Sequence, residues 1–267
     1  MSNLKLVAVG SSPIIANEIK NIAQSFLGTV IPIICTTTDQ IHTSVENAFY
    51  ICAVTQQEKL SAVIPTEQLF VFDLHPTTKF FLDIAKIPAN SSVLVFNNLL
   101  PYTKLLASEC QALGICSLDF TFLAYEENSP EAAISALQHA QYIIGVDCLI
   151  ENILKKAPFV AALRKDAIII GGQRTASIAS AGNLLAAIAK YYLNALNQGH
   201  PVDIVPVICA LKTSSTRLIT SNLGTSSPSD EAIPAIPTNS QEQIALLSYL
   251  QGKFSELFTT VQKDQCL

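Results

Sequence analysis

Short polar turns follow several apolar segments of strand length, and their hydroxyl and amide side chains could hold a small molecule. The turns are GSSP at 10–13, CTTTD at 35–39, TQQEK at 55–59, NNLLPY at 97–102, VDCL at 146–149 and GGQRT at 171–175. Hydroxyl and amide groups outnumber charged groups in these turns. That composition favours hydrogen bonding to a polar or carboxylate metabolite over acid–base catalysis.

The candidate ligand contacts are polar or glycine residues taken from these turns. They are Ser11, Ser12, Thr36, Thr55, Gln56, Asn97, Asn98, Tyr102, Asp147, Gly172, Gln173 and Thr175. Each turn also has an ordinary structural interpretation, since Ser12 before Pro13, for example, makes a good helix N-cap. The Gly171–Gly172 pair does not fit GxGxxG, and GxxxxGK[ST] occurs nowhere in the chain. We therefore expect no dinucleotide, nucleoside-triphosphate or other cofactor.

Catalytic and metal-binding patterns are weak. The seven cysteines form no CxxC pair and the four histidines show no metal-ligand spacing, so we expect no metal site and no disulfide framework. Asp73 and His75 lack the GxSxG motif of a hydrolase, and no catalytic residue is assigned. One enzyme alternative stays open, because Cys35 and Cys148 could exchange a proton at a carbon acid as in two-cysteine racemases.

The charge and hydropathy of the chain limit its partners and its location. Sixteen Lys and Arg stand against 21 Asp and Glu, giving a net charge of -5. This balance gives no general attraction to phosphate backbones, so direct nucleic-acid binding is not expected. The apolar run near the N-terminus ends at Gly10 and is too short for a signal peptide or a membrane span. We predict a cytoplasmic protein without membrane attachment.

Apolar runs of strand length alternate with segments of helical period, which predicts an α/β fold with mostly parallel sheets. The expected strands are 4–10, 29–34, 50–54, 69–72, 92–97, 117–124, 141–146 and 167–170. The expected helices are 14–26, 39–49, 76–86, 99–113, 130–139, 148–156 and 175–198. Residues 171–175 are expected to be a tight turn. These two successive series predict two Rossmann-like or flavodoxin-like lobes in a bilobed arrangement like that of periplasmic binding proteins.

The expected boundaries place residues 1–75 and 176–223 in a first lobe and 76–175 in a second. The segment VDIVPVICA at 202–210 reads as a strand, and 213–223 as a short polar strand or a loop. Residues 224–238 contain three prolines and predict a linker. Residues 239–267 form a C-terminal extension with an amphipathic helix near 240–262, interpreted as docking on the core or, alternatively, as a dimer or output helix.

The order of these segments resembles the N-terminal sensor domains of NtrC-type bacterial transcriptional activators of the PrpR type, which control propionate catabolism. The similarity covers roughly residues 3–198. It rests on LVAVGSSPIIANEIKNIAQSF, LFVFDLHPTTKFFLDIAK, SVLVFNNLLPYTKLLASECQALGI and YIIGVDCLI followed by AIIIGGQRTASIASAGNLLAAIAK. The chain departs from the family after the third expected strand, where Ala53, Val54, Thr55 and Gln56 replace a glycine-rich turn.

The resemblance implies a cytoplasmic small-molecule sensor domain of a transcriptional regulator. A polar or carboxylate metabolite would bind in a cleft between the lobes and favour their closure. No ATPase motor follows residue 198, so we expect the signal to pass to a separate effector protein, a homodimer or a longer regulator. The alternatives are the two-cysteine enzyme and an interaction scaffold that binds no small molecule.

Overall fold

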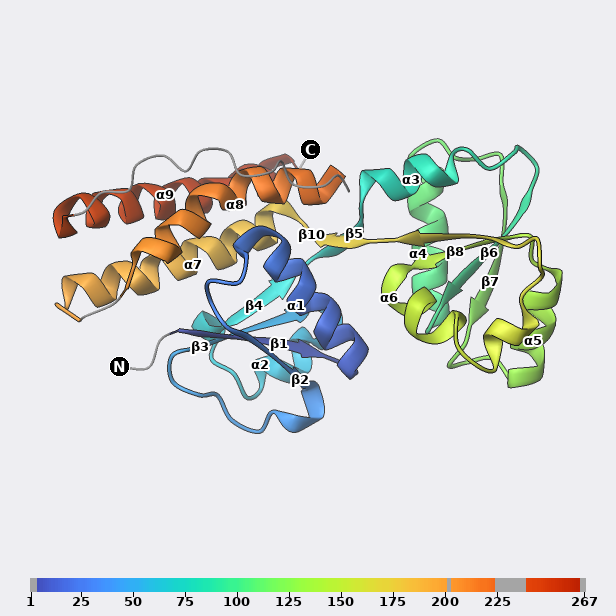
Figure 1. The fold of residues 1–267 in the computed structure, drawn as a ribbon, viewed down its shortest axis with the longest axis horizontal. Coiled ribbons are helices and arrows are strands. Elements are labelled where there is room, and N and C mark those ends of the chain that lie inside the picture. Colours follow the sequence, from blue (N-terminus) through green and yellow to red (C-terminus); the bar gives the residue numbers. More distant parts are fainter. Residues whose placement is uncertain (1–3, 201–202, 224–238, 265–267) are drawn as a thin grey trace. The chain divides into compact units, whose positions relative to one another are not determined.

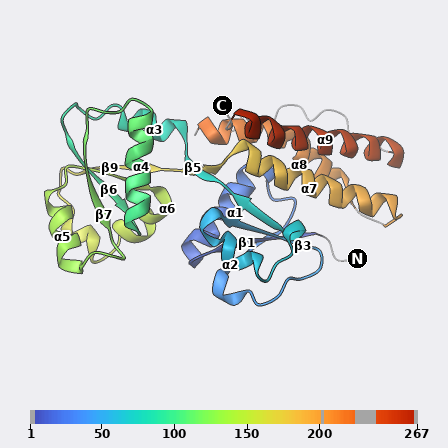
Figure 2. The same ribbon diagram turned by 180° about the vertical axis from the view of Figure 1, so that it is seen from behind.

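The computed structural model describes residues 4–200, 203–223 and 239–264. The chain divides into two compact units, and we call Met1–His75 with Thr175–Leu267 unit 1 and Pro76–Arg174 unit 2. Each unit contains one four-stranded parallel sheet with helices packed on it (Figures 1 and 2). The predicted α/β fold with two parallel sheets is confirmed.

The two sheets share one strand order. In unit 1 the order is β2-β1-β3-β4, and the strands are β1 (Lys5–Gly10), β2 (Ile33–Thr37), β3 (Ala48–Ala53) and β4 (Leu69–Phe72). In unit 2 the order is β7-β6-β8-β9, and the strands are β6 (Ser92–Asn97), β7 (Asp119–Ala124), β8 (Tyr142–Val146) and β9 (Ile168–Gly172). In both sheets the chain runs from the first strand to its neighbour on one side and then crosses to the other side. This reversal creates a topological switch point at the carboxyl ends of the first and third strands.

Helices cover both faces of the sheet in unit 1. They are α1 (Pro13–Leu27), α2 (Gln57–Ser61), α7 (Ile178–Asn197), α8 (Val205–Leu223) and α9 (Ser240–Asp264), with short 3-10 turns η1 (Thr38–Gln40), η2 (Val54–Gln56) and η3 (Thr66–Gln68). Residues from α1, α7, α8 and α9 share one core with strand residues such as Leu6 and Phe72. On the opposite face Leu60 of α2 packs with Val9 and Cys52. Helices α7, α8 and α9 lie side by side (Figure 1).

Unit 2 builds a smaller core around its own sheet. Its helical elements are α3 (Thr78–Ile84), α4 (Leu100–Ala112), α5 (Pro130–His139), α6 (Asp147–Leu149), the π-helical turn η4 (Ile150–Leu154) and the 3-10 turn η5 (Phe159–Ala162). Phe80 and Ile84 of α3 pack with Val93 and Val95 of β6. Ser129 caps α5, because its side chain accepts a hydrogen bond from the Ala132 N–H at 3.2 Å.

Two short strands carry the chain between the units, and we call them the connecting ribbon. They are β5 (Leu74–Pro76) and β10 (Arg174–Ala176), which pair with each other. The Ser177 N–H donates to the Asp73 carbonyl at 2.8 Å, and the Thr77 N–H donates to the Gln173 carbonyl at 2.9 Å. These bonds define an antiparallel pair in which His75 lies opposite Thr175.

The predicted turn at 171–175 is wrong, since Gly171 and Gly172 belong to β9 and Arg174 and Thr175 to β10, with Gln173 between the two strands. Both glycines lie where a neighbouring side chain approaches the backbone. A Cβ at residue 172 would lie 2.8 Å from the Phe80 ring, and one at residue 171 would lie 1.8 Å from Asp147 Oδ1. Gly171 and Gly172 are therefore explained by close packing within the strand. Helix α7 begins at Ile178 with Ser177 as its N-cap, three residues later than predicted.

Three further element predictions are corrected. Of the predicted helix at 39–49, only Asp39 and Gln40 are helical, in the turn η1, and residues 48–49 already belong to β3, because the β-branched Ile41, Thr43 and Val45 disfavour a helix. The predicted strand at 202–210 and the polar segment at 213–223 form helix α8, in which Val207, Leu211 and Leu218 recur at helical spacing. The predicted strand at 29–34 starts later, at Ile33, directly after Pro32. The predicted linker at 224–238 lies outside the described residues.

Two buried acidic groups are expected to make unit 1 sensitive to high pH. Burial raises the pKa of the Cys52 thiol from 9.0 to about 12, and burial followed by the nearby Tyr191 raises the pKa of Tyr192 from 10.0 to about 12. The unfolded chain keeps the ordinary values and therefore loses these protons first. We expect the free energy of unfolding to be undiminished by these groups below pH 9 and to fall between pH 9 and about 12.

Urea unfolding at stepped pH measures this fall. Cys52→Ala should make the alkaline slope shallower, whereas Cys116→Ala, which removes an exposed thiol, should leave it as in the wild type. If the unfolding free energy falls equally steeply with pH in the wild type and in both variants, the buried Cys52 thiol does not contribute to the alkaline loss of stability.

Candidate functional site

The carboxyl edge of the unit 1 sheet gathers several of the predicted contacts. Ser11 and Ser12 form the turn between β1 and α1, Thr36 lies near the end of β2, and Thr55 and Gln56 follow β3. Residues at the ends of neighbouring parallel strands meet along one edge of a sheet, and this edge includes the switch point between β1 and β3. The β1–α1 turn is tight, because a Cβ on Gly10 would lie 2.3 Å from the Ala16 nitrogen.

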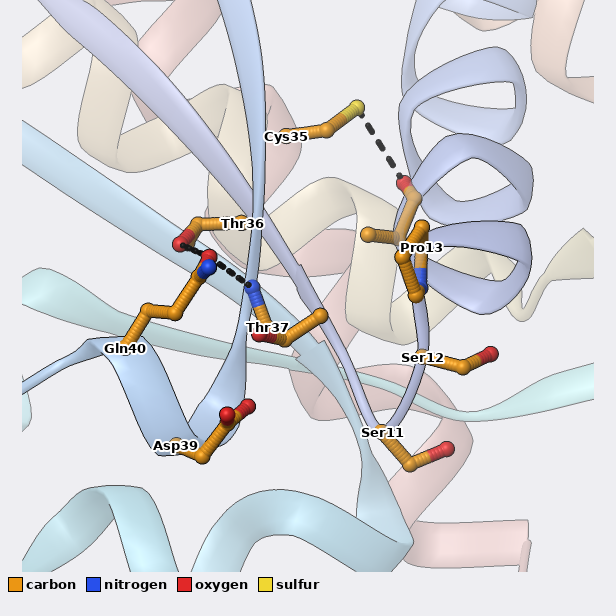
Figure 3. Close-up of a pocket in the computed structure, with 9 residues that line it drawn as sticks. Ser11, Ser12, Pro13, Cys35, Thr36, Thr37, Asp39 and Gln40 are labelled. Atoms are coloured by element: carbon orange, nitrogen blue, oxygen red, sulfur yellow. Dashed lines mark hydrogen bonds between the residues drawn. The ribbon is translucent and has the colours of Figure 1, made fainter.

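A pocket of about 410 Å³ opens between the β1–α1 turn and the end of β2. Its lining residues are Ser11, Ser12, Pro13, Ala16, Cys35, Thr36, Thr37, Asp39 and Gln40 (Figure 3). Hydroxyl, amide and carboxylate groups predominate among them. The pocket is of a size that suits a small polar molecule.

Internal hydrogen bonds fix the side of this pocket that is formed by the end of β2 and by η1. The Thr36 hydroxyl donates to Gln40 Oε1 at 3.0 Å, and the Thr37 N–H donates to the same oxygen at 3.3 Å (Figure 3). Two donors thus hold the amide of Gln40 in one orientation. The Gln40 carbonyl oxygen is already engaged, so the NH₂ end of this side chain is the part best suited to a ligand acceptor.

The start of α1 leaves few backbone amides for an anion. Pro13 has no N–H, the Ile15 N–H donates to the Ser12 hydroxyl at 3.4 Å, and the Ala16 N–H donates to the Ser12 carbonyl at 2.9 Å. A helix N-terminus binds anions through free amides, and most of the first turn is already used here. Side-chain hydroxyls therefore dominate the chemistry of this wall.

A second pocket of about 510 Å³ adjoins the first and shares Ser11 and Asp39 with it. It reaches the switch point, where the Thr38 hydroxyl donates its one hydrogen to Gln56 Oε1 at 2.8 Å and has the Gly10 carbonyl as a second acceptor within 3.2 Å. These bonds tie η1 to the ends of β1 and β3. The two pockets therefore form one continuous polar edge, and we call it the unit 1 edge.

Asp39 brings a negatively charged carboxylate to the unit 1 edge. A hydrogen bond from the Thr37 side chain lowers the pKa of this carboxyl below its usual value. The carboxylate is exposed, so water screens its field. It still favours hydroxyl or ammonium groups of a ligand over a carboxylate at this position.

The carboxyl edge of the unit 2 sheet differs from the unit 1 edge. Here side chains of the chain itself occupy the positions that a ligand could take. Asn97 is 7% exposed, and its Oδ1 accepts from the Asn98 N–H at 2.8 Å. The Leu100 N–H at the start of α4 donates to Glu127 Oε2 at 3.3 Å. A carboxylate of the chain therefore takes the place that an anionic ligand could use. Tyr102 lies in the first turn of the same helix.

The remaining predicted contacts lie in or beside packed structure. Asp147 starts α6, and its carboxylate lies against Gly171. Gly172 packs under Phe80, and the Gln173 carbonyl accepts a bond within the connecting ribbon. Thr175 is fully buried, and its hydroxyl is 3.0 Å from the Ser221 hydroxyl. These four residues already have packing or hydrogen-bonding roles within their own units.

Pro13, Thr37, Thr38, Asp39, Gln40 and Lys59 line the unit 1 edge without having been chosen from the sequence. The available signal was the turn CTTTD at 35–39, from which only Thr36 was selected. The predicted helix at 39–49 included Asp39 and Gln40, so their position beside Ser11 in the pocket was not predicted. Cys35, one of the two candidate racemase thiols, lines the pocket and its Sγ lies 3.6 Å from the Ala16 carbonyl. Cys148 lies in unit 2, in α6, and the enzyme alternative stays a prediction.

No helix in the described part of the chain has both the length and the apolar composition to cross a membrane. Within the same residues, no three His, Cys, Asp or Glu side chains gather so that they could hold a metal ion.

Comparison of the chain with models of known protein families, with curated proteins and with solved structures found no match. The resemblance to PrpR-type sensor domains therefore stays a prediction from the sequence.

Proposed function

We propose that this chain is a sensor domain that binds a small polar metabolite at the unit 1 edge. The observation that carries the proposal is the paired pocket at the carboxyl ends of β1, β2 and β3. Hydroxyl, amide and carboxylate groups line both pockets, and the second also contains Lys59 and apolar side chains such as Leu60 and Val63. Parallel α/β sheets bind ligands at this edge and at this switch point. The fixed hydrogen bonds of Gln40 and Thr38 support a preformed site.

The chemistry of the unit 1 edge favours a neutral or amine-bearing ligand rich in hydroxyl groups. Ser11 and Thr36 offer hydroxyls, Gln40 offers an amide NH₂, and Asp39 offers an acceptor for hydroxyl or ammonium groups. In the first pocket a carboxylate would face the charge of Asp39 and would find few free amides at the start of α1, whereas the ammonium group of Lys59 lines the second pocket only. Within the proposed class, polyols and amino compounds are thus preferred to simple carboxylates.

The regulatory part of the proposal is that the bound metabolite changes the state of the connecting ribbon and so alters a partner protein. Its support is the segment order that resembles PrpR-type sensor domains. A ligand shifts such an equilibrium only by its different affinity for the two states. The transcriptional partner is proposed on this resemblance alone.

Thermal unfolding with a panel of polyols, amino acids and hydroxycarboxylates tests the binding proposal. At one hundred times its dissociation constant, a true ligand adds about 2.7 kcal/mol of stability and should raise the Tm of the wild type by roughly 5–10 °C. Thr36→Val and Ser11→Ala each remove one hydroxyl from the pocket and should weaken binding about three- to tenfold. Ser61→Ala, an exposed serine in α2 outside both pockets, should bind as the wild type does.

Asp39→Asn then separates ligand classes. It should weaken binding of amino compounds and strengthen binding of hydroxycarboxylates, because it removes a charge without changing the shape of the side chain. A wild type whose Tm no compound in the panel raises contradicts the binding proposal. Equal Tm shifts in Thr36→Val, Ser11→Ala and Ser61→Ala contradict its location.

A further inference from the structure

The last turn of α8 holds the connecting ribbon at its centre. His75 of β5 and Thr175 of β10 lie opposite each other, and two consecutive residues of α8, Ser221 and Asn222, contact them. The His75 Nε2 lies 2.9 Å from Asn222 Oδ1, and the Thr175 hydroxyl lies 3.0 Å from the Ser221 hydroxyl. All four residues belong to unit 1.

The hydrogen-bond network fixes the donors and acceptors. The Asn222 NH₂ donates to the Leu218 carbonyl at 2.8 Å and to the Ala176 carbonyl at 3.4 Å. The Asn222 Oδ1 is therefore the acceptor, and His75 must carry its hydrogen on Nε2. One asparagine thus connects α8 to both strands of the ribbon.

The ribbon side of these contacts is buried, whereas His75, Ser221 and Asn222 are half-buried. Thr175 and Ala176 are fully buried, as is Ser214 two turns earlier in α8, and Leu218 is 1% exposed. The Ser221 hydroxyl also lies 3.2 Å from the exposed Ser25 hydroxyl of α1, so it contacts α1 as well as the ribbon. Polar groups in such surroundings lose stability when a partner is removed. The ribbon strands are only three residues each, so these contacts are a large part of what holds them.

We propose that the last turn of α8, through Ser221 and Asn222, is a latch that couples the conformation of the connecting ribbon to helix α8. Any twist of the ribbon then either carries the end of α8 with it or breaks the His75–Asn222 and Thr175–Ser221 contacts. Two discrete arrangements of one packed element are what a switch requires. That a metabolite operates the latch rests on the proposed function, whereas the latch itself does not.

Hydrogen exchange of the full chain, without any added compound, tests the latch. Asn222→Ala should raise the exchange rates of the ribbon amides, and of the flanking Ser177 and Thr77 amides that bond across it, by about three- to tenfold. Ser221→Ala is the milder second variant and should raise them less. Ser215→Ala, at an exposed serine of the same helix, is the matched control and should leave ribbon exchange unchanged.

Coupling must also run in the opposite direction. His75→Ala should speed exchange in the last turn of α8, residues 219–223, and leave residues 207–214 near the wild-type rates. Equal ribbon exchange in Asn222→Ala, Ser221→Ala and Ser215→Ala overturns the latch, as does an α8 that does not respond to His75→Ala. Because no compound is present, these outcomes are independent of whether the binding proposal succeeds.

Discussion

Gly10→Ala is expected to destabilise unit 1 by roughly 3 kcal/mol or more, one of the larger effects of a single methyl group in this chain. A Cβ at residue 10 would lie 2.3 Å from the Ala16 nitrogen, 2.8 Å from the Ile15 carbonyl carbon and 2.8 Å from the Ser12 oxygen. All three are backbone atoms, which no rotamer change can move away. The first turn of α1 would have to shift, and the wall of the pocket with it.

The Tm of Gly10→Ala should therefore fall by roughly 6–12 °C, measured by differential scanning calorimetry. The matched control is Gly252→Ala in α9, where no atom lies within 4 Å of the added Cβ. Alanine is the better helix former, so this control should be neutral or stabilising by up to about 1 kcal/mol. A Gly10→Ala chain that melts with the wild type would show that the β1–α1 turn is not tight.

Phe72→Ala is expected to cost about 3–5 kcal/mol, the range for deleting a buried aromatic ring. Phe72 ends β4, is 0% exposed, and its ring centroid lies 6.0 Å from that of Phe26 in α1. Its removal leaves a cavity between the sheet and the helices of the main core of unit 1. Close-packed interiors relax only in part around such a cavity.

Urea unfolding with an unchanged m-value measures this loss directly. Phe122→Ala is the control, because this ring on β7 of unit 2 is 37% exposed. Phe122→Ala should lower the free energy of unfolding by less than half as much as Phe72→Ala, since part of the Phe122 ring is already in water. Equal losses at the two positions would contradict the assignment of Phe72 to a closed core.

The strands were the part of the fold that the sequence predicted well. Runs such as LVAVG at 6–10 and VLVFN at 93–97 are apolar over strand length, because a parallel sheet is buried on both faces. Helix α8 was missed because Val205, Val207 and Ile208 favour strands by type. The contacts of Val207 and Ile208 with the helices and sheet of unit 1 override that preference.

The glycine pair at 171–172 shows a limit of reading turns from composition. Two glycines in sequence indicate a turn in most chains. Here they sit in β9, where Asp147 and Phe80 approach the backbone too closely for any Cβ. Such long-range packing leaves no local signal in the sequence.

Only part of the candidate site was predicted, again because contacts between residues far apart in the sequence leave no local pattern. Ser11, Ser12, Thr36 and Gln56 were selected as polar residues after strands, and the structure brings them to the unit 1 edge. Asp39 and Gln40 were assigned to a helix that does not form, so their place in the pocket was missed. The position of η1 is set by the bond from Thr38 to Gln56, across 18 residues, which periodicity does not report.

The most direct test of the account is a map of backbone amide shifts in the folded chain during titration with polyols, amino acids and hydroxycarboxylates. We predict that at least one compound shifts the amides of residues 11–16 and 36–40 together, with smaller changes at residues 97–102 of unit 2. Binding compounds that shift only amides outside the unit 1 edge would contradict the account, as would a panel in which no compound shifts any amide.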